Sequence, residues 1–255
     1  MKSQPKRLRQ ESILAELRAS PAIRIAELAA THAVSTETIR RDLDELSGEG
    51  LISRTYGGAT GAPLAAEPLL DDRYRANVEQ RTSMAKATAL LVQKGDSLMI
   101  DSGATTIYVA RRLAAELSDL TVLTNSFGVA TALAANPSIR ILMCPGQYHP
   151  SDGGVTGPET LAYLRSFSVA TTIIGASRLD IEGPSDFNSA SVWVKRTMIE
   201  RARQTVLVLD NSKFEQKAFE TICALDAVDH LVTDGDPPKP LLAAIQGAGV
   251  RVHIA

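Results

Sequence analysis

Short apolar runs alternate with stretches of helical spacing from residue 77 onward. The apolar runs lie at 97–100, 121–124, 139–143, 169–175, 205–209, 230–233 and 250–254. Helical patterns lie at 77–92, 106–117, 128–135, 158–167, 192–202 and 239–246. Strand, helix and strand at this spacing are typical of a sheet with crossover helices. The pattern predicts an α/β domain with a mostly parallel sheet and flanking helices.

Small polar residues follow the first two predicted strands. The first loop comprises Asp101, Ser102, Gly103, Ala104, Thr105 and Thr106, and the second comprises Thr124, Asn125 and Ser126. Small residues let a ligand approach the backbone closely, and the N–H groups at the start of a helix suit a phosphate. Open α/β sheets bind their ligands at the carboxyl ends of the strands. Both loops are therefore candidates for an anion site.

Three further groups extend this candidate site. Asp152, Gly153 and Gly154 form another flexible polar turn, and Lys195 and Lys213 supply cations that could neutralise a phosphate. Each group also has an ordinary interpretation, because polar turns commonly follow strands and lysines commonly lie on exposed helix faces. Their recurrence along one edge of the predicted sheet favours a binding site.

The first sixty residues have the spacing of three short helices. The apolar positions are Ile13, Leu14 and Leu17 in the first helix, Ile25, Leu28 and Ala29 in the second, and Ile39, Leu43 and Leu46 in the third, with Val34 just before it. Ser35 stands where a helix N-cap belongs, ahead of a helix that starts at Thr36. We expect these apolar faces to form one small core.

The polar face at the start of the third predicted helix is the candidate DNA-binding surface. In helix-turn-helix proteins this end of the helix enters the major groove, where Arg can form a bidentate contact with guanine. Residues 50–58 have the pattern of a hairpin wing that could hold the DNA backbone. The alternative is a three-helix scaffold whose arginines are simply solvated. The candidate DNA-binding residues are Ser35, Thr36, Glu37, Thr38, Arg40, Arg41, Arg54 and Tyr56.

A segment rich in Gly, Ala and Pro separates the two parts of the chain. It includes residues 57–63 and 65–68, which have the composition of a flexible joint. We therefore expect a winged helix-turn-helix domain at 1–60, a linker at 61–76 and an α/β domain at 77–255.

Composition narrows the possible functions. The 255 residues carry a net charge of −2, and aromatic residues make up only 4%, too few for a single-strand stacking platform. No apolar run approaches the roughly 20 residues that cross a bilayer, and the basic start does not lead into a signal-peptide core. Cys144 and Cys223 are too few for a disulfide framework or a zinc site. We expect a cytoplasmic protein with no membrane partner and no cofactor.

The N-terminal pattern resembles the helix-turn-helix signature of the DeoR family of bacterial transcription regulators. The matching positions are Arg9-x3-Ile13-x3-Leu17-x17-Ser35-x2-Thr38-Ile39-Arg40-Arg41-Asp42-Leu43. Residues 49–52 and 57–59 resemble the family's wing, although Tyr56 stands where a His is more usual. The resemblance implies that double-stranded operator DNA is a partner and that the regulator most often represses.

The remaining segments resemble the C-terminal effector domain of DeoR regulators, which is similar in fold to ribose-5-phosphate isomerase and glucosamine-6-phosphate deaminase. The segments are 101–106, 124–126, 152–154 with Gly157, 175–177, 195–196 and 212–214. The resemblance implies that a phosphorylated sugar or related metabolite binds without turnover, in a homo-oligomer of two or four subunits. Residues 102–106 would hold the phosphate, with Lys213 as a second anion partner. Thr124, Asn125, Asp152 and Lys195 would face the sugar.

Three positions depart from the family's pattern. Pro145 stands where a Gly is frequent, His149 stands where an Arg is frequent, and Ser191 lies where the family commonly has a Glu. Without that Arg and that carboxylate, different groups of a ligand would find charged partners. The family's usual effectors are therefore not assigned to this chain.

Three functions stay open at this point. A ligand-responsive transcriptional regulator leads. A sugar-phosphate isomerase or deaminase with an added DNA-binding head would need a poised carboxylate or His, for which Asp152, Asp186 and His149 are available. A ligand-independent DNA-binding protein would need its C-terminal domain only for oligomerisation, and such a domain has no use for the loop at 102–106.

Overall fold

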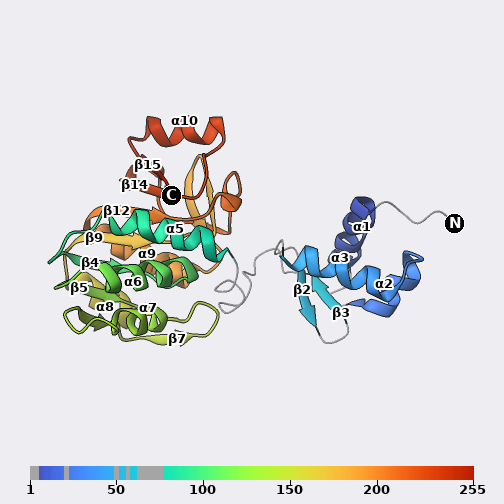
Figure 1. Cartoon of the computed structure of the whole chain (residues 1–255), viewed down its shortest axis with the longest axis horizontal. Coiled ribbons are helices and arrows are strands. Elements are labelled where there is room, and N and C mark those ends of the chain that lie inside the picture. The colour runs from blue at the N-terminus through green and yellow to red at the C-terminus, as the bar shows by residue number, and fades with distance from the viewer. Residues whose placement is uncertain (1–5, 20–22, 49–51, 56–57, 62–76) are drawn as a thin grey trace. The chain divides into compact units, whose positions relative to one another are not determined.

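The computed structural model describes residues 6–19, 23–48, 52–55, 58–61 and 77–255 (Figure 1). The chain divides into two compact units, one covering Met1–Pro68 and the other Leu69–Ala255. Each unit has its own buried apolar core, so each is described separately. None of the described helices has the length and apolar character needed to cross a membrane.

The described part of the N-terminal unit contains three helices and a small antiparallel sheet. The helices are α1 (Lys6–Ala19), α2 (Ile25–Thr31) and α3 (Thr36–Gly48), and the strands are β1 (Ile23–Arg24), β2 (Ile52–Thr55) and β3 (Gly58–Gly61), in the order β1-β3-β2. The three predicted helices are therefore confirmed, and so is a hairpin of β2 and β3. The two-residue strand β1 was not predicted, because it is too short to show an alternating pattern.

The core of this unit is made of the apolar faces that the spacing predicts. Ile13, Leu28, Ile39 and Leu43 have no exposed surface, whereas Val34 is only half-buried at the edge of the core. Each such aliphatic side chain contributes about 1.5–3 kcal/mol when it leaves water. Burial of these positions fixes which face of α3 remains at the surface.

A buried ion pair joins α1 to α3. The Nε and Nη2 atoms of Arg9 donate to the two carboxylate oxygens of Asp42 at 2.6 and 3.1 Å. Both residues are less than a tenth exposed. Hydrogen bonding to Asp42 raises the pKa of Arg9 above its ordinary value. This two-point contact sets the position of α3 along α1.

The C-terminal unit is built on a seven-stranded sheet in which every neighbouring pair is parallel. The strands, in spatial order, are β15 (Arg251–Ile254), β14 (His230–Thr233), β12 (Ala202–Val208), β9 (Val169–Ile174), β4 (Ser97–Ile100), β5 (Thr121–Thr124) and β6 (Arg140–Met143). All seven correspond to predicted apolar runs. Parallel strands are buried on both faces and therefore appear in the sequence as continuous apolar segments.

Helices cover both faces of this sheet (Figure 1). One face packs against α5 (Val78–Ala89), α6 (Ala104–Glu116) and α7 (Phe127–Leu133), and the other packs against α8 (Pro158–Arg165), α9 (Ser189–Glu200) and α10 (Lys239–Gly247). Alternation along β4 shows the two faces, because Leu98 and Ile100 belong to the first core and Met99 belongs to the second. The predicted α/β architecture is confirmed.

The order of the strands creates a switch point beside β4. From β4 the chain continues to β5 and β6 on one side of the sheet, and then crosses to β9, β12, β14 and β15 on the other. Connections therefore leave the carboxyl ends of β4 and β9 in opposite directions. A crevice outside such strands is the usual ligand site of an open α/β sheet.

Short antiparallel strands lie beyond the carboxyl ends of the sheet strands. One is the pair β7 (Gln147–His149) and β8 (Gly154–Thr156), and the other is the sheet β10 (Arg178–Asp180), β11 (Gly183–Asp186) and β13 (Glu220–Thr221). Single 3-10 turns lie at Asn211–Lys213 and Leu225–Ala227. None of these elements was predicted, because each is four residues or shorter and most are polar.

Removal of the carboxylate from the buried pair should loosen the N-terminal unit. We expect Asp42→Ala to lower its free energy of unfolding by about 3–5 kcal/mol, because the Arg9 guanidinium would stay buried without its carboxylate. Hydrogen–deuterium exchange of α1 and α3 in the full chain measures this change. Glu45→Ala is the control, since Glu45 pairs with Lys6 between the same two helices but is exposed. Equal acceleration of exchange in the two variants would contradict the prediction.

Candidate functional site

The start of α3 is organised by Ser35. Its Oγ accepts a hydrogen bond from the backbone N–H of Thr38 at 3.1 Å and lies 2.9 Å from the Thr38 hydroxyl. This is the geometry of an N-cap, so the predicted cap is confirmed. The bond fixes the first turn of α3, from which the predicted DNA-binding side chains project.

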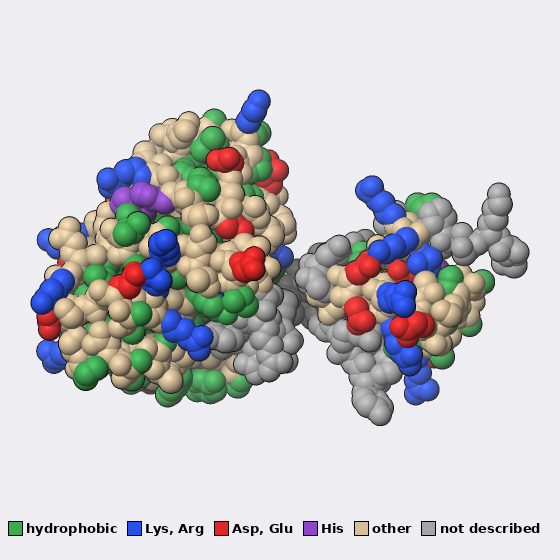
Figure 2. Space-filling view, in the orientation of Figure 1, with side chains coloured by type: hydrophobic (Ala, Val, Ile, Leu, Met, Phe, Trp, Pro, Cys, Tyr) green, Lys and Arg blue, Asp and Glu red, His purple; other side chains and the backbone are tan. Residues whose placement is uncertain are grey.

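Four side chains of this turn are exposed, namely those of Thr36, Glu37, Arg40 and Arg41, while Thr38 is half-buried. Both arginines contact Glu37, with nearest N–O distances of 3.4 Å for Arg40 and 3.7 Å for Arg41. Exposed pairs of this kind contribute little to stability, so an incoming phosphate or base can displace them. Basic and acidic side chains alternate over the visible face of this unit (Figure 2).

The hairpin that follows α3 has a defined register. Arg54 pairs with Ala59 across the β2–β3 ladder, and Thr55 pairs with Gly58. The predicted contacts of the wing concern the Arg54 side chain and Tyr56, and both lie outside the described part of the chain.

Three predicted loops meet at the carboxyl edge of the large sheet. Asn125, after β5, donates from Nδ2 to Ser102 Oγ at 3.5 Å, linking the second loop to the first. Gly154, at the start of β8, approaches both, because a Cβ built there would lie 2.7 Å from Ser102 Cβ and 3.0 Å from the Asn125 backbone oxygen. The Phe127 N–H donates to Gly153 O at 3.1 Å. Residues about 50 positions apart in the sequence thus form one cluster.

Some predicted hydroxyls shape these loops. Thr106 Oγ1 donates to the backbone oxygens of Gly103 and Asp101, and Thr124 Oγ1 donates to Ile100 O. Ser126 caps α7 by accepting from the N–H of Val129 at 3.3 Å. Thr106, Thr124 and Ser126 are all buried. Ala104 and Thr105 begin α6, whose first N–H groups have no partner within the helix and carry partial positive charge.

A buried arginine reaches this cluster from α5. Arg81 is 5% exposed, and its Nε donates to Thr105 Oγ1 at 3.3 Å. Arg81 was not among the residues predicted from the sequence. A signal was present, because Arg81 lies three, four and seven positions before Met84, Ala85 and Thr88, on the face of α5 that the apolar residues bury. A cation on a buried helix face often has a specific partner or ligand.

Lys195 of α9 lies between two buried carboxylates. Its Nζ contacts Asp186 of β11 and lies 3.3 Å from Asp101 Oδ2. All three residues are less than a tenth exposed. Asp186 also accepts hydrogen bonds from the Ser177 hydroxyl and the Phe187 N–H. The cation therefore connects the end of β4 with β11, and Asp186 extends this link to Ser177 in the loop after β9.

The two carboxylates of this cluster differ in their pKa. Burial raises the pKa of Asp101 to about 6, even though Lys195 acts in the opposite direction. Burial would also raise the pKa of Asp186, but the charge of Lys195 and the hydrogen bonds hold it below its ordinary value. Lys195 thus pairs principally with Asp186, and Asp101 is the less compensated carboxylate.

Other predicted residues line the same edge. Asp152 accepts hydrogen bonds from Asn188 Nδ2 at 2.8 Å and Ser191 Oγ at 3.1 Å. Ser191, which departs from the family's pattern, thus presents a hydroxyl donor to Asp152. Lys213 donates to Ala176 O at 2.7 Å, in the loop that follows β9.

Three buried oxygen atoms at this edge have no hydrogen-bond partner within the described residues, and one of them, Thr233 Oγ1, lies at the end of β14. The other two, Asp101 Oδ1 and Asn125 Oδ1, lie beside the switch point. Buried polar atoms are nearly always satisfied, so unpaired ones at a ligand-binding edge are informative.

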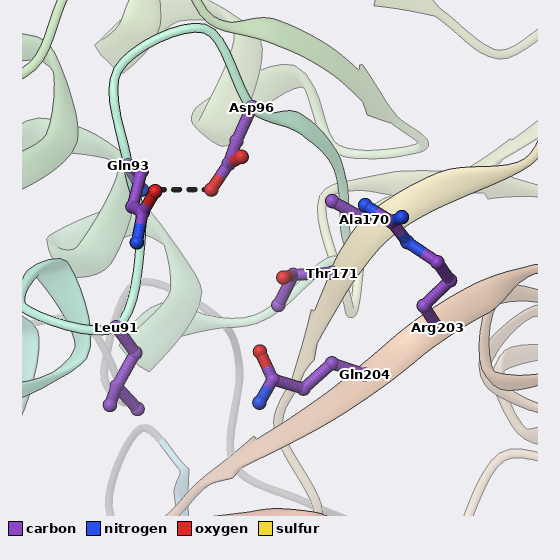
Figure 3. A pocket seen from close by; sticks show the side chains of 7 residues that line it. All are labelled: Leu91, Gln93, Asp96, Ala170, Thr171, Arg203 and Gln204. Atoms are coloured by element: carbon purple, nitrogen blue, oxygen red, sulfur yellow. Dashed lines mark hydrogen bonds between the residues drawn. The ribbon is translucent and has the colours of Figure 1, made fainter.

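A cavity of about 290 Å³ lies at the opposite edge of the sheet (Figure 3). Its lining comes from the amino ends of β9 and β12 and from the segment before β4, and it comprises Leu91, Gln93, Asp96, Ala170, Thr171, Arg203 and Gln204. The Gln93 N–H donates to Asp96 Oδ2 at 2.8 Å, as the figure shows. None of the predicted site residues lines this cavity.

Family models match both units. The model of the DeoR-like helix-turn-helix domain matches residues 9–62, and that of the DeoR C-terminal sensor domain matches residues 76–235. The chain belongs to the DeoR family. This DeoR-family protein is a DNA-binding transcriptional regulator with a sensor domain.

Curated relatives of this DeoR-family regulator cover nearly its whole length. The glycerol-3-phosphate regulon repressors of Escherichia coli K12 and Haemophilus influenzae are 32% and 36% identical, over 89% and 92% of this chain and 90% and 91% of theirs. A putative aga operon transcriptional repressor of Escherichia coli O157:H7 is 31% identical, over 96% of this chain and 92% of its own. Among solved structures, ribose 5-phosphate isomerase A of Methanocaldococcus jannaschii has 16% identity and a TM-score of 0.41, over 55% of each chain.

The raised pKa of Asp101 predicts a pH-dependent stability difference. Between pH 3.8 and about 6 the unfolded chain releases a proton that folded Asp101 keeps, so wild-type stability falls as the pH rises through this window. Relative to Asp101→Asn, the wild type should lose up to about 3 kcal/mol of its free energy of unfolding. Urea titrations between pH 4 and 7.5, followed through Trp193, measure the difference.

Asp119→Asn is the control for this prediction. It removes an exposed carboxylate whose pKa a hydrogen bond from Lys94 lowers, so its pH trend should be weak and opposite in sign. A difference between wild type and Asp101→Asn that stays constant from pH 4 to 7.5 would contradict the prediction.

Proposed function

We propose that this DeoR-family regulator is a repressor of a carbohydrate-catabolism operon, and that a phosphorylated sugar or related metabolite binds its sensor domain and weakens its hold on operator DNA. The observation that carries the proposal is the convergence of three polar loops, the start of α6 and the buried cations Arg81 and Lys195 at the switch point of the sheet. A domain that served only to oligomerise would not need such a cluster.

The DNA-binding half of the proposal assigns the start of α3 to the major groove. The residues that would contact DNA are Ser35, Thr36, Glu37, Thr38, Arg40 and Arg41, with Arg54 and Tyr56 from the wing. An Arg that forks onto guanine reads sequence, whereas hydroxyls and wing residues hold the backbone. A homo-oligomer, formed through the C-terminal domain as a dimer or tetramer, would present paired reading heads to repeated half-sites.

The effector half of the proposal assigns the phosphate to residues 102–106. The first N–H groups of α6 and the guanidinium of Arg81 would neutralise it. Asn125, Asp152 and Lys195 would face the rest of the molecule, and Lys213 would stand at the far side of the crevice. Thr124 would act on the loop through its hydrogen bond to Ile100 O. The bounds 1–60, 61–76 and 77–255 remain our prediction for the domains.

Regulation requires that the effector bind two conformations of the protein with different affinity. Coupling of about 1–3 kcal/mol between the sensor and DNA sites is typical of such proteins. We propose binding without turnover, because the curated relatives of this chain are named as repressors. Conversion of a phosphosugar by the purified protein would favour the isomerase alternative instead.

Arg41→Ala tests the assignment of α3. We expect its affinity for an operator fragment, selected with the wild-type protein from random DNA, to fall about 5- to 150-fold, because a base contact contributes about 1–3 kcal/mol. Fluorescence anisotropy at fixed salt measures the affinity. Arg140→Ala, which removes an exposed arginine of the C-terminal unit, is the control and should bind as the wild type does. An unchanged affinity of the Arg41 variant would refute this placement.

Gly154→Ala tests the effector site. A methyl group there would meet Ser102 Cβ and the Asn125 backbone, and would therefore push apart the two loops proposed to hold the ligand. Wild-type protein should be stabilised by about 2.7 kcal/mol at 100 times the Kd of a phosphorylated ligand, and the variant should lose most of this thermal shift. Its affinity for operator DNA should remain.

Gly247→Ala is the matched control for the effector site, because an added Cβ would meet no atom within 4 Å. It should respond to ligands as the wild type does. The screen pairs phosphorylated with unphosphorylated sugars, polyols and sugar acids. A wild-type shift that does not depend on the phosphate, or no shift at all, would remove the support for a phosphate site and favour the ligand-independent alternative.

A further inference from the structure

Two hydrogen-bond acceptors at the carboxyl edge of the large sheet directly follow the neighbouring strands β4 and β5. Ile100 of β4 pairs with Thr124 of β5, so Asp101 and Asn125 are the first residues after the two strands. Adjacent strands are about 4.8 Å apart, so one small polyhydroxy molecule can reach both side chains. Both residues are 1% exposed, and each has one oxygen without a partner in the described residues.

The orientation of both side chains is fixed by their other atoms. Asn125 Nδ2 donates to Val155 O at 2.9 Å, and because a carbonyl oxygen only accepts, the amide nitrogen must face Val155. Asp101 Oδ2 receives the N–H of Gly175 at 3.2 Å and the ammonium of Lys195 at 3.3 Å. The remaining oxygen of each side chain is therefore an acceptor whose position the fold determines.

These two acceptors determine which functional groups of a ligand can bind beside them. A hydroxyl can donate to each of them, whereas an ionised carboxylate or phosphate can only accept. Asp101 repels an anion in addition, since its compensating cation, Lys195, is shared with Asp186. A phosphate is instead favoured a few residues further on, at the start of α6 beside Arg81.

We propose that the effector is a polyhydroxy compound with one phosphate and no carboxylate, and that two of its hydroxyls donate to Asp101 Oδ1 and Asn125 Oδ1. A carboxylate in place of these hydroxyls is rejected. This inference rests on the proposed phosphate site and adds which class of phosphorylated metabolite the site accepts. Sugar and polyol phosphates belong to that class, and aldonate phosphates do not.

Burial adds a conformational requirement. Both oxygens are shielded from solvent, so a ligand reaches them only when the segments at this edge move apart. Binding is thereby coupled to a rearrangement of the sensor domain, which a ligand held only by its phosphate would not need to cause.

The test compares polyol phosphates with the aldonate phosphates of the same chain length. The pairs are erythritol 4-phosphate with erythronate 4-phosphate, ribitol 5-phosphate with ribonate 5-phosphate, and glucitol 6-phosphate with gluconate 6-phosphate. Calorimetry on the wild-type full chain should show that, in the pair that binds best, the polyol phosphate binds at least tenfold more tightly than its aldonate. This comparison needs no variant to fold.

Asp101→Asn then tests which residue is responsible. The amide can donate to a carboxylate and carries no charge, so the preference for the polyol should shrink to less than threefold. Asp226→Asn, which removes an exposed carboxylate elsewhere in the same unit, should keep the wild-type preference. An aldonate phosphate that binds the wild type as tightly as its polyol partner would overturn the inference while leaving the phosphate site intact. Absence of binding by all six compounds and by inorganic phosphate would overturn the phosphate site as well.

Discussion

One buried ammonium group holds together the segments at the carboxyl edge of the seven-stranded sheet. Lys195 leaves water almost completely, and this would be unfavourable without the charges of Asp186 and Asp101. These three residues come from α9, β11 and the end of β4, so their attraction holds together segments that no backbone ladder joins. The cluster has one positive and two negative charges. Lys195 compensates the charge of Asp186 more fully than that of Asp101. The residue at the switch point is therefore held in place without being fully neutralised.

A buried ion pair also holds the N-terminal unit together, but its charges balance. There Arg9 and Asp42 neutralise each other through two hydrogen bonds, and both belong to the motif that carries the family resemblance. The pair is a fixed joint that places α3 against α1. Arg40 and Arg41, which are proposed to bind DNA, pair with Glu37 at longer distances and in water. One unit thus uses the same residue type both to set a helix and to leave a side chain available for a partner.

The sequence was most informative where burial is continuous. All seven parallel strands could be predicted, because their positions face apolar helices on both sides. β11 could not be predicted, since Gly183–Asp186 is buried at every position although its sequence is polar. The partners of Asp186, Ser177 and Lys195, lie nine positions away on either side in other elements, and no periodic pattern links them to it. The loops after β4 and β5 were chosen from their composition, whereas Arg81 was missed because its partner Thr105 lies 24 residues away. The hydrophobic pattern of the sequence shows which face of a helix or strand is buried. It does not show which side chains from separate elements contact one another.

The place of Arg81 in the chain has a mechanical consequence. It lies in the opening turns of α5, the first helix of the sensor unit within the described residues. A ligand that draws its guanidinium toward the sheet would rotate or shift the end of the helix to which the DNA-reading unit is covalently attached. Because linkage is reciprocal, DNA that constrains this attachment would alter how readily Arg81 meets the ligand.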